Sequence, residues 1–282
     1  MRADNTMSSP IAYTIKPIMI NIEQHAKQPS RATSLEELDC VIDKLFDSEK
    51  LALGLTFQPQ PEDIVITPYA KCGTTWLQQI THGLRTRGDM DFDEINSVVP
   101  WIEIAHDVGW DLSDPQIAKP RLFKSHASAY EIPIGCRYIC SFRHPRAVIE
   151  SHYRFYEGWL FESGAISLEE FLHWRWPRDQ VDSRGYWYHL TSWWEQRHNP
   201  NVLLLCYEDM LLNPTTTVEK IARFMGIELD DSLLNLVLQQ SSRKFMLEHK
   251  HKFDERHLQQ LAAKRALLPH CLLYTSPSPR DS

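Results

Sequence analysis

The stretch from Glu62 to Gly88 most constrains the fold, because an apolar, β-branched run is followed at once by a short loop and a helical pattern. The sequence EDIVITP, residues 62–68, has the composition of a short buried strand that ends at a proline. The loop YAKCG follows, and TTWLQQITHGLRTRG then places apolar residues at helical spacing. The stretch therefore predicts a strand, a tight turn and a helix in direct succession.

The same order recurs farther along the chain. RLFKSH (121–126) and RYICSF (137–142) are typical of short strands, and the second leads into the helical run 145–159. NVLLLCYEDM (201–210) is typical of a buried strand and is followed by a helical run over 213–227. Strands that alternate with helices predict a single P-loop-like α/β domain, with a central, mainly parallel sheet flanked by helices on both faces. In such sheets ligands bind beyond the carboxyl ends of the strands.

Composition divides the chain into three parts. Residues 1–33 are polar and irregular, and we expect no regular structure there. Residues 34–270 form the predicted domain, which opens with a helix capped by Ser34, with Glu37 three places on. Residues 271–282, CLLYTSPSPRDS, differ sharply in composition from the rest and are treated separately below.

Charge and cysteine usage limit the partners that the chain could have. A formal net charge of −7 argues against a nucleic-acid or anionic-membrane binder, which usually needs a basic face. No run approaches the ~20 apolar residues of a membrane span, and the beginning of the chain lacks a signal-peptide pattern, so we expect a cytoplasmic protein. The six cysteines contain no CxxC pair, which favours reduced thiols over disulfides or a metal site.

The loop after the first predicted strand has the chemistry of a single-phosphate site. It is shorter than the GxxxxGK[ST] loop of nucleoside triphosphatases, and only Gly73 is flexible. A helix starting there would aim the N–H groups of Cys72 through Thr75 at an anion, with the hydroxyls of Thr74 and Thr75 as further donors. Lys71 would stand beside whatever is joined to that phosphate. Taken alone, the loop could equally be a chance strand-to-helix turn.

Polar residues at the ends of two other predicted strands could complete the site. Arg143 follows one strand, and Ser151 lies two turns into the next helix, so both could reach a second phosphate. Lys124 and His126 end another strand, and a histidine with a pKa of ~6.5 suits general-base work. The alternatives are a surface arginine beside a helical serine, and a structural histidine.

Four motifs together resemble the cytosolic sulfotransferase family, which uses 3′-phosphoadenosine 5′-phosphosulfate (PAPS). KCGTTW, PRLFKSH, RHPRAVIESHY and NVLLLCYEDM occur in the family's order and spacing, between about Glu62 and Gly226. The resemblance implies the sulfotransferase fold and transfer of a sulfonate group from PAPS to a hydroxyl or amine of a small acceptor. It also implies in-line transfer and no metal, and the net charge already argues against a nucleic-acid or membrane partner.

The resemblance assigns a role to each motif residue. Lys71 matches the cation at the leaving phosphate, Lys124 matches the residue that helps to hold the sulfonate, and His126 matches the catalytic base. The remaining residues match the donor site: Cys72, Gly73, Thr74 and Thr75 at the 5′-phosphate, Trp76 and Tyr207 at the adenine, and Arg143 and Ser151 at the 3′-phosphate.

Two departures and an aromatic pattern refine this assignment. Ala70 and Cys72 stand where many members have proline and serine, so we expect a less ordered loop with its chemistry intact. VVPWIE and FYEGWLF supply Trp101, Tyr156 and Trp159, which predict an apolar slot for a hydrophobic or aromatic alcohol, phenol or amine. Each of these aromatic residues could equally be ordinary core.

The family's C-terminal motif R-K-G-x-x-G-D-W, which clamps the 3′-phosphate, does not occur in this sequence. Residues 271–281 resemble the translation of a transposon-end sequencing adapter, so we expect a truncated domain with a non-native tail. Residues 242–244, Ser-Arg-Lys, are not expected to replace the clamp, because no glycine pair follows.

Because the clamp does not occur, an alternative function is a non-catalytic module that binds PAPS or its product PAP. A Mg²⁺-dependent kinase is disfavoured by the lack of GK[ST], and the acceptor and the oligomeric state cannot be read from the sequence.

Overall fold

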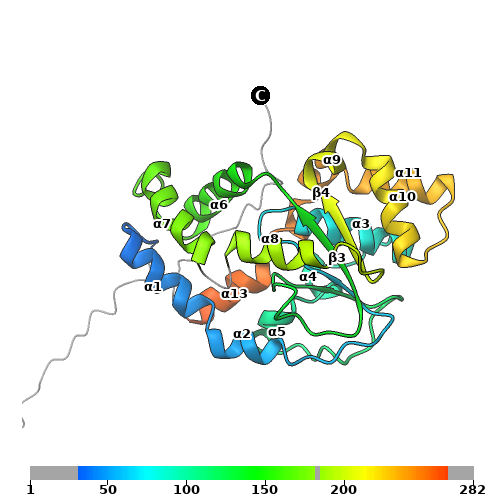
Figure 1. Ribbon diagram of the computed structural model, residues 1–282, viewed down its shortest axis with the longest axis horizontal. Coiled ribbons are helices and arrows are strands. Elements are labelled where there is room, and N and C mark those ends of the chain that lie inside the picture. Colours follow the sequence, from blue (N-terminus) through cyan, green and yellow to red (C-terminus); the bar gives the residue numbers. More distant parts are fainter. Residues whose placement is uncertain (1–30, 182–184, 266–282) are drawn as a thin grey trace, which may run out of the picture.

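The structure is a computed structural model that describes residues 31–181 and 185–265 (Figure 1). A four-stranded sheet of order β2-β1-β3-β4 lies at its centre, and all three pairings are parallel. The strands are β1 (Ile64–Ile66), β2 (Leu122–Lys124), β3 (Arg137–Phe142) and β4 (Val202–Cys206). The helical elements in chain order are α1 (Leu35–Leu45), α2 (Ser48–Gly54), α3 (Thr74–Thr86), α4 (Ile95–Val98), η1 (Ile102–Ile104), α5 (Ala105–Val108), α6 (Pro145–Trp159), α7 (Leu168–Val181), α8 (Tyr186–Glu195), α9 (Tyr207–Leu212), α10 (Pro214–Met225), α11 (Asp231–Gln240), α12 (Arg243–Glu248), η2 (Lys250–Lys252) and α13 (Arg256–Lys264).

Alternate residues of the strands face opposite layers of helices, as the pleat of a strand requires. Ile64 and Ile66 of β1 pack in one apolar cluster with residues of α3, α10 and α11. Val65, between them, packs in another cluster with Phe123 of β2 and Trp193 of α8. The predicted α/β fold with a parallel sheet covered on both faces is thus confirmed.

A third apolar cluster joins segments from opposite ends of the described chain. Leu38 and Leu45 of α1 pack with Leu258 and Leu261 of α13, and α6 also contributes to this cluster. Figure 1 shows α1 and α13 close together below α6. Arg265, at the end of α13, donates hydrogen bonds of 2.7 Å to two carbonyls at the end of α1. The C-terminal helix therefore belongs to the same folded body as the first helix.

Local signals in the sequence account for several element boundaries. Ser34 accepts a hydrogen bond from the N–H of Glu37, which is the predicted cap of α1. Pro145 lies in the first turn of α6, and Gly226 ends α10 with a φ of 73°. The leading helical run is two helices, because Asp47 caps a second helix, α2, with its carboxylate.

The strand predicted over residues 201–210 is shorter and more exposed than expected. β4 ends at Cys206, and Tyr207 is the first residue of α9 rather than the end of a strand. Three of the five β4 residues are half-buried, because β4 is an edge strand that pairs only with β3. Its apolar run therefore reflects packing on one face.

Two of the predicted boundaries concern the ends of the chain. The predicted boundary after residue 270 and the tail 271–282 lie outside the described residues. Ala32, in the segment expected to be irregular, forms an isolated parallel bridge with Phe161.

Each cysteine that the structure describes is a free thiol, and Cys72, Cys136 and Cys140 are buried.

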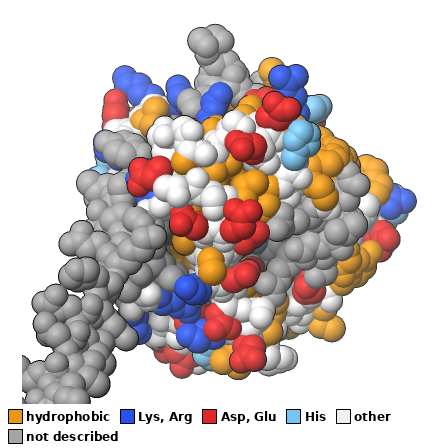
Figure 2. All heavy atoms as spheres, turned by 90° about the vertical axis from the view of Figure 1, so that its left-hand side faces the viewer, with side chains coloured by type: hydrophobic (Ala, Val, Ile, Leu, Met, Phe, Trp, Pro, Cys, Tyr) orange, Lys and Arg blue, Asp and Glu red, His pale blue; other side chains and the backbone are white. Residues whose placement is uncertain are grey.

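The face that carries α1 and α7 shows acidic side chains scattered among hydrophobic and uncharged ones (Figure 2). Within the described ranges, no helix combines the length and the apolar character that crossing a bilayer requires.

Candidate active site

The turn between β1 and α3 has a backbone that glycine alone adopts without strain. Gly73 has a φ of 97°, and Lys71, two residues earlier, has a φ of 69°. A Cβ atom on Gly73 would lie 2.9 Å from Cδ2 of Tyr207. Gly73 is therefore required both by its conformation and by the close approach of the tyrosine ring.

The start of α3 forms an anion-binding cradle. Gly73 caps the helix without a side-chain hydrogen bond, and the first N–H groups of a helix have no partner within it. The Thr74 hydroxyl is buried and has no hydrogen-bond partner among the described residues. Donors of this kind, combined with the positive end of the helix dipole, favour a phosphate or sulfonate oxygen.

Cys72 takes no part in this cradle. Its N–H donates to the Tyr69 carbonyl at 3.0 Å, and its carbonyl accepts from Ser141 Oγ at 2.5 Å. Its side chain is buried against Tyr69, Val148 and Tyr186. The structure thus does not bring Cys72 to the cavity with the other predicted anion ligands, because its N–H is bonded within the turn and its thiol is buried.

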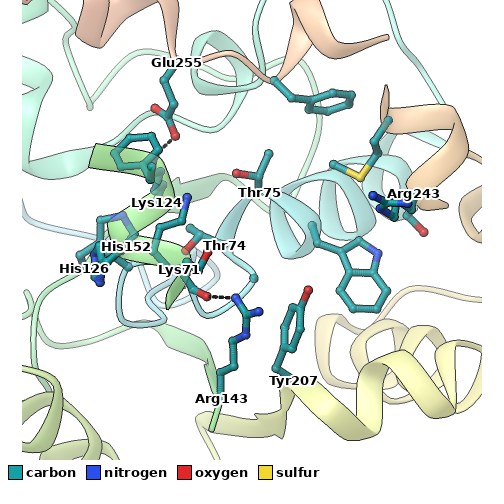
Figure 3. A pocket seen from close by; sticks show the side chains of 18 of the residues that line it. Lys71, Thr74, Thr75, Lys124, His126, Arg143, His152, Tyr207, Arg243 and Glu255 are labelled. Carbon is teal, nitrogen blue, oxygen red and sulfur yellow. Dashed lines mark hydrogen bonds and ion pairs between the residues drawn. The ribbon is translucent and has the colours of Figure 1, made fainter. Parts of the chain in front are cut away.

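One cavity of about 740 Å³ lies at the carboxyl ends of the strands and contains every other predicted site residue. The residues that it brings together are Lys71, Gly73, Thr74, Thr75, Trp76, Trp101, Lys124, His126, Arg143, Ser151, Tyr156, Trp159 and Tyr207. Figure 3 shows Lys71, Lys124 and Arg143 grouped around Thr74 and Thr75. We call Lys71, Gly73, Thr74 and Thr75 the donor wall.

Lys71 is a half-buried cation at the edge of the cavity. Its ammonium lies 4.2 Å from the centre of the Phe155 ring. Burial, assisted by the charges of Arg143 and Lys124 and opposed by the charge of Glu255, lowers the pKa of Lys71 to about 8. At neutral pH Lys71 is therefore mainly charged, and an anion bound beside it would stabilise the charge further.

Arg143 links the loop to the beginning of α9. Its guanidinium donates to the Lys71 carbonyl at 2.8 Å and lies 4.6 Å from the centre of the Tyr207 ring. Tyr207 in turn packs edge-on against Trp76, with ring centres 5.9 Å apart. The predicted phosphate and adenine residues are thus neighbours, although they come from three different segments.

His126 presents one nitrogen to the cavity in a state that can accept a proton. Its Nδ1 lies 2.8 Å from the Pro68 carbonyl, which can only accept a hydrogen bond, so Nδ1 carries the hydrogen and Nε2 does not. Burial, assisted by the charge of Lys124, lowers the pKa of His126 to about 4. The ring is therefore neutral at physiological pH.

Glu103, which the sequence did not reveal, binds the backbone N–H of His126. One carboxylate oxygen accepts from the N–H of His126 at 2.7 Å and from the Ser125 hydroxyl at 2.9 Å. Burial raises the pKa of Glu103. Its only sequence signal was a charged residue inside the otherwise apolar stretch VVPWIE.

Aromatic side chains also line the cavity, and they are more numerous than the three predicted from the sequence. Trp101 packs edge-on against His126, with ring centres 5.2 Å apart. Phe46 and Phe155 also line the cavity; Phe46 belongs to no motif, and Phe155 opens the stretch FYEGWLF but was not singled out. We call this set the acceptor wall: Phe46, Trp101, Phe155, Tyr156 and Trp159.

Two charged residues on the C-terminal side of the cavity were also missed. Glu255 lies just before α13, and its carboxylate forms an ion pair of 2.7 Å with Lys124. Arg243, in the segment not expected to contribute to ligand binding, lines the cavity on the side away from Lys124 (Figure 3). Neither position carried a motif that could have revealed it.

Sequence comparison identifies the family. The model described as the sulfotransferase domain matches residues 61–271. The chain belongs to the sulfotransferase family. Sulfotransferase 1 family member D1 of Mus musculus is 32% identical over 206 residues, 69% of this chain and 69% of that protein. Sulfotransferase 2A1 of Homo sapiens is 34% identical over 206 residues, 69% of this chain and 70% of that protein.

Solved structures share the sulfotransferase fold. The structure of mouse sulfotransferase SULT7A1 complexed with PAP has a TM-score of 0.57 and 23% identity, covering 72% of each chain. Retinol dehydratase in a complex with retinol and PAP has a TM-score of 0.55 and 17% identity, covering 87% of this chain and 98% of that one. The sulfotransferase predicted from the four motifs is thus confirmed as to family and fold.

Proposed function

We propose that this sulfotransferase transfers the sulfonate group of PAPS to a hydroxyl or amine of a small hydrophobic or aromatic acceptor, with His126 as the general base. One observation carries the proposal. A single cavity joins an anion cradle at the start of α3, a neutral histidine with an unprotonated Nε2, and an aromatic wall. Each part matches one need of the reaction: a place for the donor, a base, and a place for the acceptor.

The donor wall fits the 5′-phosphosulfate of PAPS. The Thr74 hydroxyl has no partner among the described residues, the first N–H groups of α3 have no partner within the helix, and Lys71 supplies a positive charge beside them. Arg143 and Ser151 are proposed to bind the 3′-phosphate, and Trp76 and Tyr207 the adenine. The complexes of two solved relatives with PAP, the product that PAPS leaves, support this choice of donor.

In the proposed transfer step, the residues of the cavity account for the proton that is removed and for the charge that develops on the leaving oxygen. Nε2 of His126 accepts the proton of the acceptor hydroxyl or amine while the acceptor atom forms a bond to sulfur. The bond between sulfur and the 5′-phosphate oxygen breaks, and the electron pair stays on that oxygen. Lys71 is proposed to donate a hydrogen bond to this oxygen, and Lys124 to the sulfonate. A cation already in place where charge develops lowers the barrier without reorganisation.

The acceptor wall favours a flat or hydrophobic acceptor. Its side chains are aromatic, and such surfaces bind apolar ligands by burial and ring stacking. Retinol in the complex of retinol dehydratase is an alcohol of this character, although the likeness to that protein is one of fold. That the protein is cytoplasmic and needs no metal stays a prediction.

Calorimetric titration of PAP tests the donor site, with 5′-AMP as the control that lacks the 3′-phosphate. We expect clear preference for PAP, because Arg143 and Ser151 line the cavity together with the donor wall. Equal or absent binding of the two nucleotides would contradict the proposal. Turnover of labelled PAPS with a panel of phenols, alcohols and amines then tests transfer, and it separates an enzyme from a module that only binds the nucleotide.

A further inference from the structure

The sulfonate-facing part of the site already holds a carboxylate. Nζ of Lys124 lies 2.7 Å from Oε1 of Glu255, and the side chains are only 2% and 13% exposed. Figure 3 shows Glu255 reaching toward Lys124 from the C-terminal segment. Glu255 is the sole acidic residue among the cavity-lining residues that the structure describes, whereas Lys71, Lys124, Arg143 and Arg243 are cationic.

The neighbours of Lys124 show what a ligand would replace. The face of the Trp101 ring lies 4.1 Å from Nζ, so one side of the ammonium is covered by an aromatic surface. The carboxylate is the only oxygen partner recorded for Nζ among the described residues. A buried ammonium needs an anion or another acceptor, and a sulfonate oxygen has the same charge and hydrogen-bonding capacity as the carboxylate oxygen.

Lys124 and Asn96 hold the Glu255 carboxylate, and the helix that follows does not. Although Glu255 stands at the N-cap position of α13, its side chain caps no N–H group of that helix. The neighbouring segment is held independently: Lys252 Nζ donates to the Phe92 carbonyl and Arg256 to the Asp93 carbonyl, each at 2.5 Å. The side chain can therefore leave Lys124 while the segment stays attached.

The carboxylate is kept charged and acts on the reacting groups. Burial alone would raise the pKa of Glu255, but the charge of Lys124 and hydrogen bonds from Lys124 and Asn96 together lower it. The Asn96 amide donates to Oε2 at 2.8 Å. The negative charge in turn raises the pKa values of Lys71 and His126.

We infer that Glu255 competes with the sulfonate of the donor for Lys124, and that it thereby sets how strongly the protein distinguishes PAPS from PAP. PAP lacks the sulfonate, so it can bind the donor wall while Glu255 stays on Lys124. PAPS must displace Glu255 from Lys124. The affinity of the protein for PAPS is therefore lower by the free energy of the contact between Glu255 and Lys124. The inference rests on the proposed function, because it assumes that Lys124 faces the sulfonate.

Measuring the dissociation constants of PAPS and PAP for the wild type and for Glu255→Gln, without acceptor, tests the inference. The substitution removes the charge and keeps an amide oxygen that can accept from Asn96. We expect PAPS to bind at least fivefold more tightly and PAP to change less than twofold. An unchanged ratio, or weaker binding of PAPS, would show that Glu255 positions Lys124 rather than competing for it.

Three further variants control for charge, folding and mechanism. Glu208→Gln removes a carboxylate that accepts from the His144 N–H and does not line the cavity, and we expect it to leave the ratio unchanged. Glu255→Asn removes the charge with a residue that tolerates a positive φ, so it should reproduce the effect even if glutamine disturbs folding. In a Lys124→Met background, Glu255→Gln should have no effect on the ratio; a persisting increase contradicts direct competition.

Failure of the inference is distinct from failure of the proposed function. If the wild type binds PAP in preference to 5′-AMP but the ratio does not respond to Glu255→Gln, the competition is wrong and the donor assignment stands. If the wild type binds neither PAPS nor PAP, the proposed function itself fails.

Discussion

The donor wall and the acceptor wall share one cavity but are built in different ways. The donor wall comes from four residues within Lys71–Thr75, placed by one strand, one turn and one helix. The acceptor wall takes Phe46 from the end of α1, Trp101 from the chain before η1 and three residues from α6. Chemistry that needs a fixed geometry is therefore encoded locally, whereas recognition of the acceptor depends on how distant segments pack.

The two walls also differ in the polarity of their side chains. The donor wall carries the Lys71 ammonium and the Thr74 hydroxyl, which is buried without a partner among the described residues, whereas the acceptor wall is mainly apolar and has one such buried polar atom, Nε1 of Trp101. The acceptor-wall rings pack against one another; Phe155 and Trp159, for example, have ring centres 5.7 Å apart. Perturbing the donor wall should therefore abolish the chemistry, whereas perturbing the acceptor wall should change its selectivity.

Replacing the residue that lies between the two walls should have the largest effect. We expect His126→Ala to lower kcat by ~10²–10⁴, because it removes the general base. The affinity for PAP should stay within about twofold, since the base contacts the acceptor. Steady-state kinetics with labelled PAPS and calorimetry with PAP measure the two quantities.

His189→Asn is the matched control for His126. His189 is also buried, and its Nε2 lies 3.0 Å from the Thr67 carbonyl, but it does not line the cavity. It should keep kcat while lowering the melting temperature. Equal losses of kcat in both variants would mean that His126 acts through packing rather than as a base.

Replacing Lys71, in the donor wall, should have the second largest effect. Lys71→Met is expected to lower kcat/KM by ~10²–10³, as loss of one charge-stabilising donor does. Because the pKa of Lys71 is lowered to about 8, wild-type kcat/KM should fall as the pH rises through that value and the ammonium loses its proton. On the acid side it should fall as the pH drops through about 4 and His126 gains a proton.

Lys71→Arg separates charge from shape. Arginine stays protonated, so the alkaline fall should move upward out of the measurable range, even if the longer side chain lowers the maximum rate. An alkaline fall that stays near pH 8 in this variant would assign it to another group.

The sequence predicts the locally encoded donor wall better than the acceptor wall, which distant segments assemble. Strand, glycine turn and helix are contiguous, so their alternation predicted the parallel sheet and placed Lys71 and Thr74 at its edge. Lys124, His126 and Arg143 could be located because parallel strands end at a common edge. Tyr207 was correctly brought to the cavity, although it begins a helix rather than ending a strand.

What the sequence could not predict depends on tertiary packing. Phe46 and Glu255 come from helix ends with no local pattern, and α1 meets α13 through a shared apolar cluster and through the hydrogen bonds of Arg265, none of which the sequence reveals. The inward direction of the Cys72 N–H depends on the left-handed turn around it, which K-C-G does not specify. Glu103 is buried beside His126 only because η1 follows the bridge between Trp101 and Lys124.

Gly73 tests whether the donor wall depends on its backbone. In Gly73→Ala the new Cβ would lie 2.9 Å from Tyr207 Cδ2 at a φ of 97°, so the loop must shift. Strain of about 1–3 kcal/mol in the loop when PAP is bound would weaken PAP binding by up to ~100-fold. Gly135→Ala is the control, because Gly135 has a φ of 107° with nothing within 4 Å of its Cβ position. It should lose some stability but keep its affinity for PAP; equal losses of affinity would make the Tyr207 contact irrelevant.

The smallest effect should come from the acceptor wall, through Phe46. Phe46→Ala removes a half-buried ring that lies 6.2 Å from Trp101, centre to centre, so an apolar acceptor loses contact area. We expect KM for the best acceptor to rise about tenfold with little change in kcat, since apolar pocket contacts contribute ~1–3 kcal/mol. PAP affinity should be unchanged, and Phe46→Leu should restore most of the loss. A fall in PAP affinity in Phe46→Ala would show that the two walls are mechanically coupled, and the division between local chemistry and assembled recognition would then fail for this cavity.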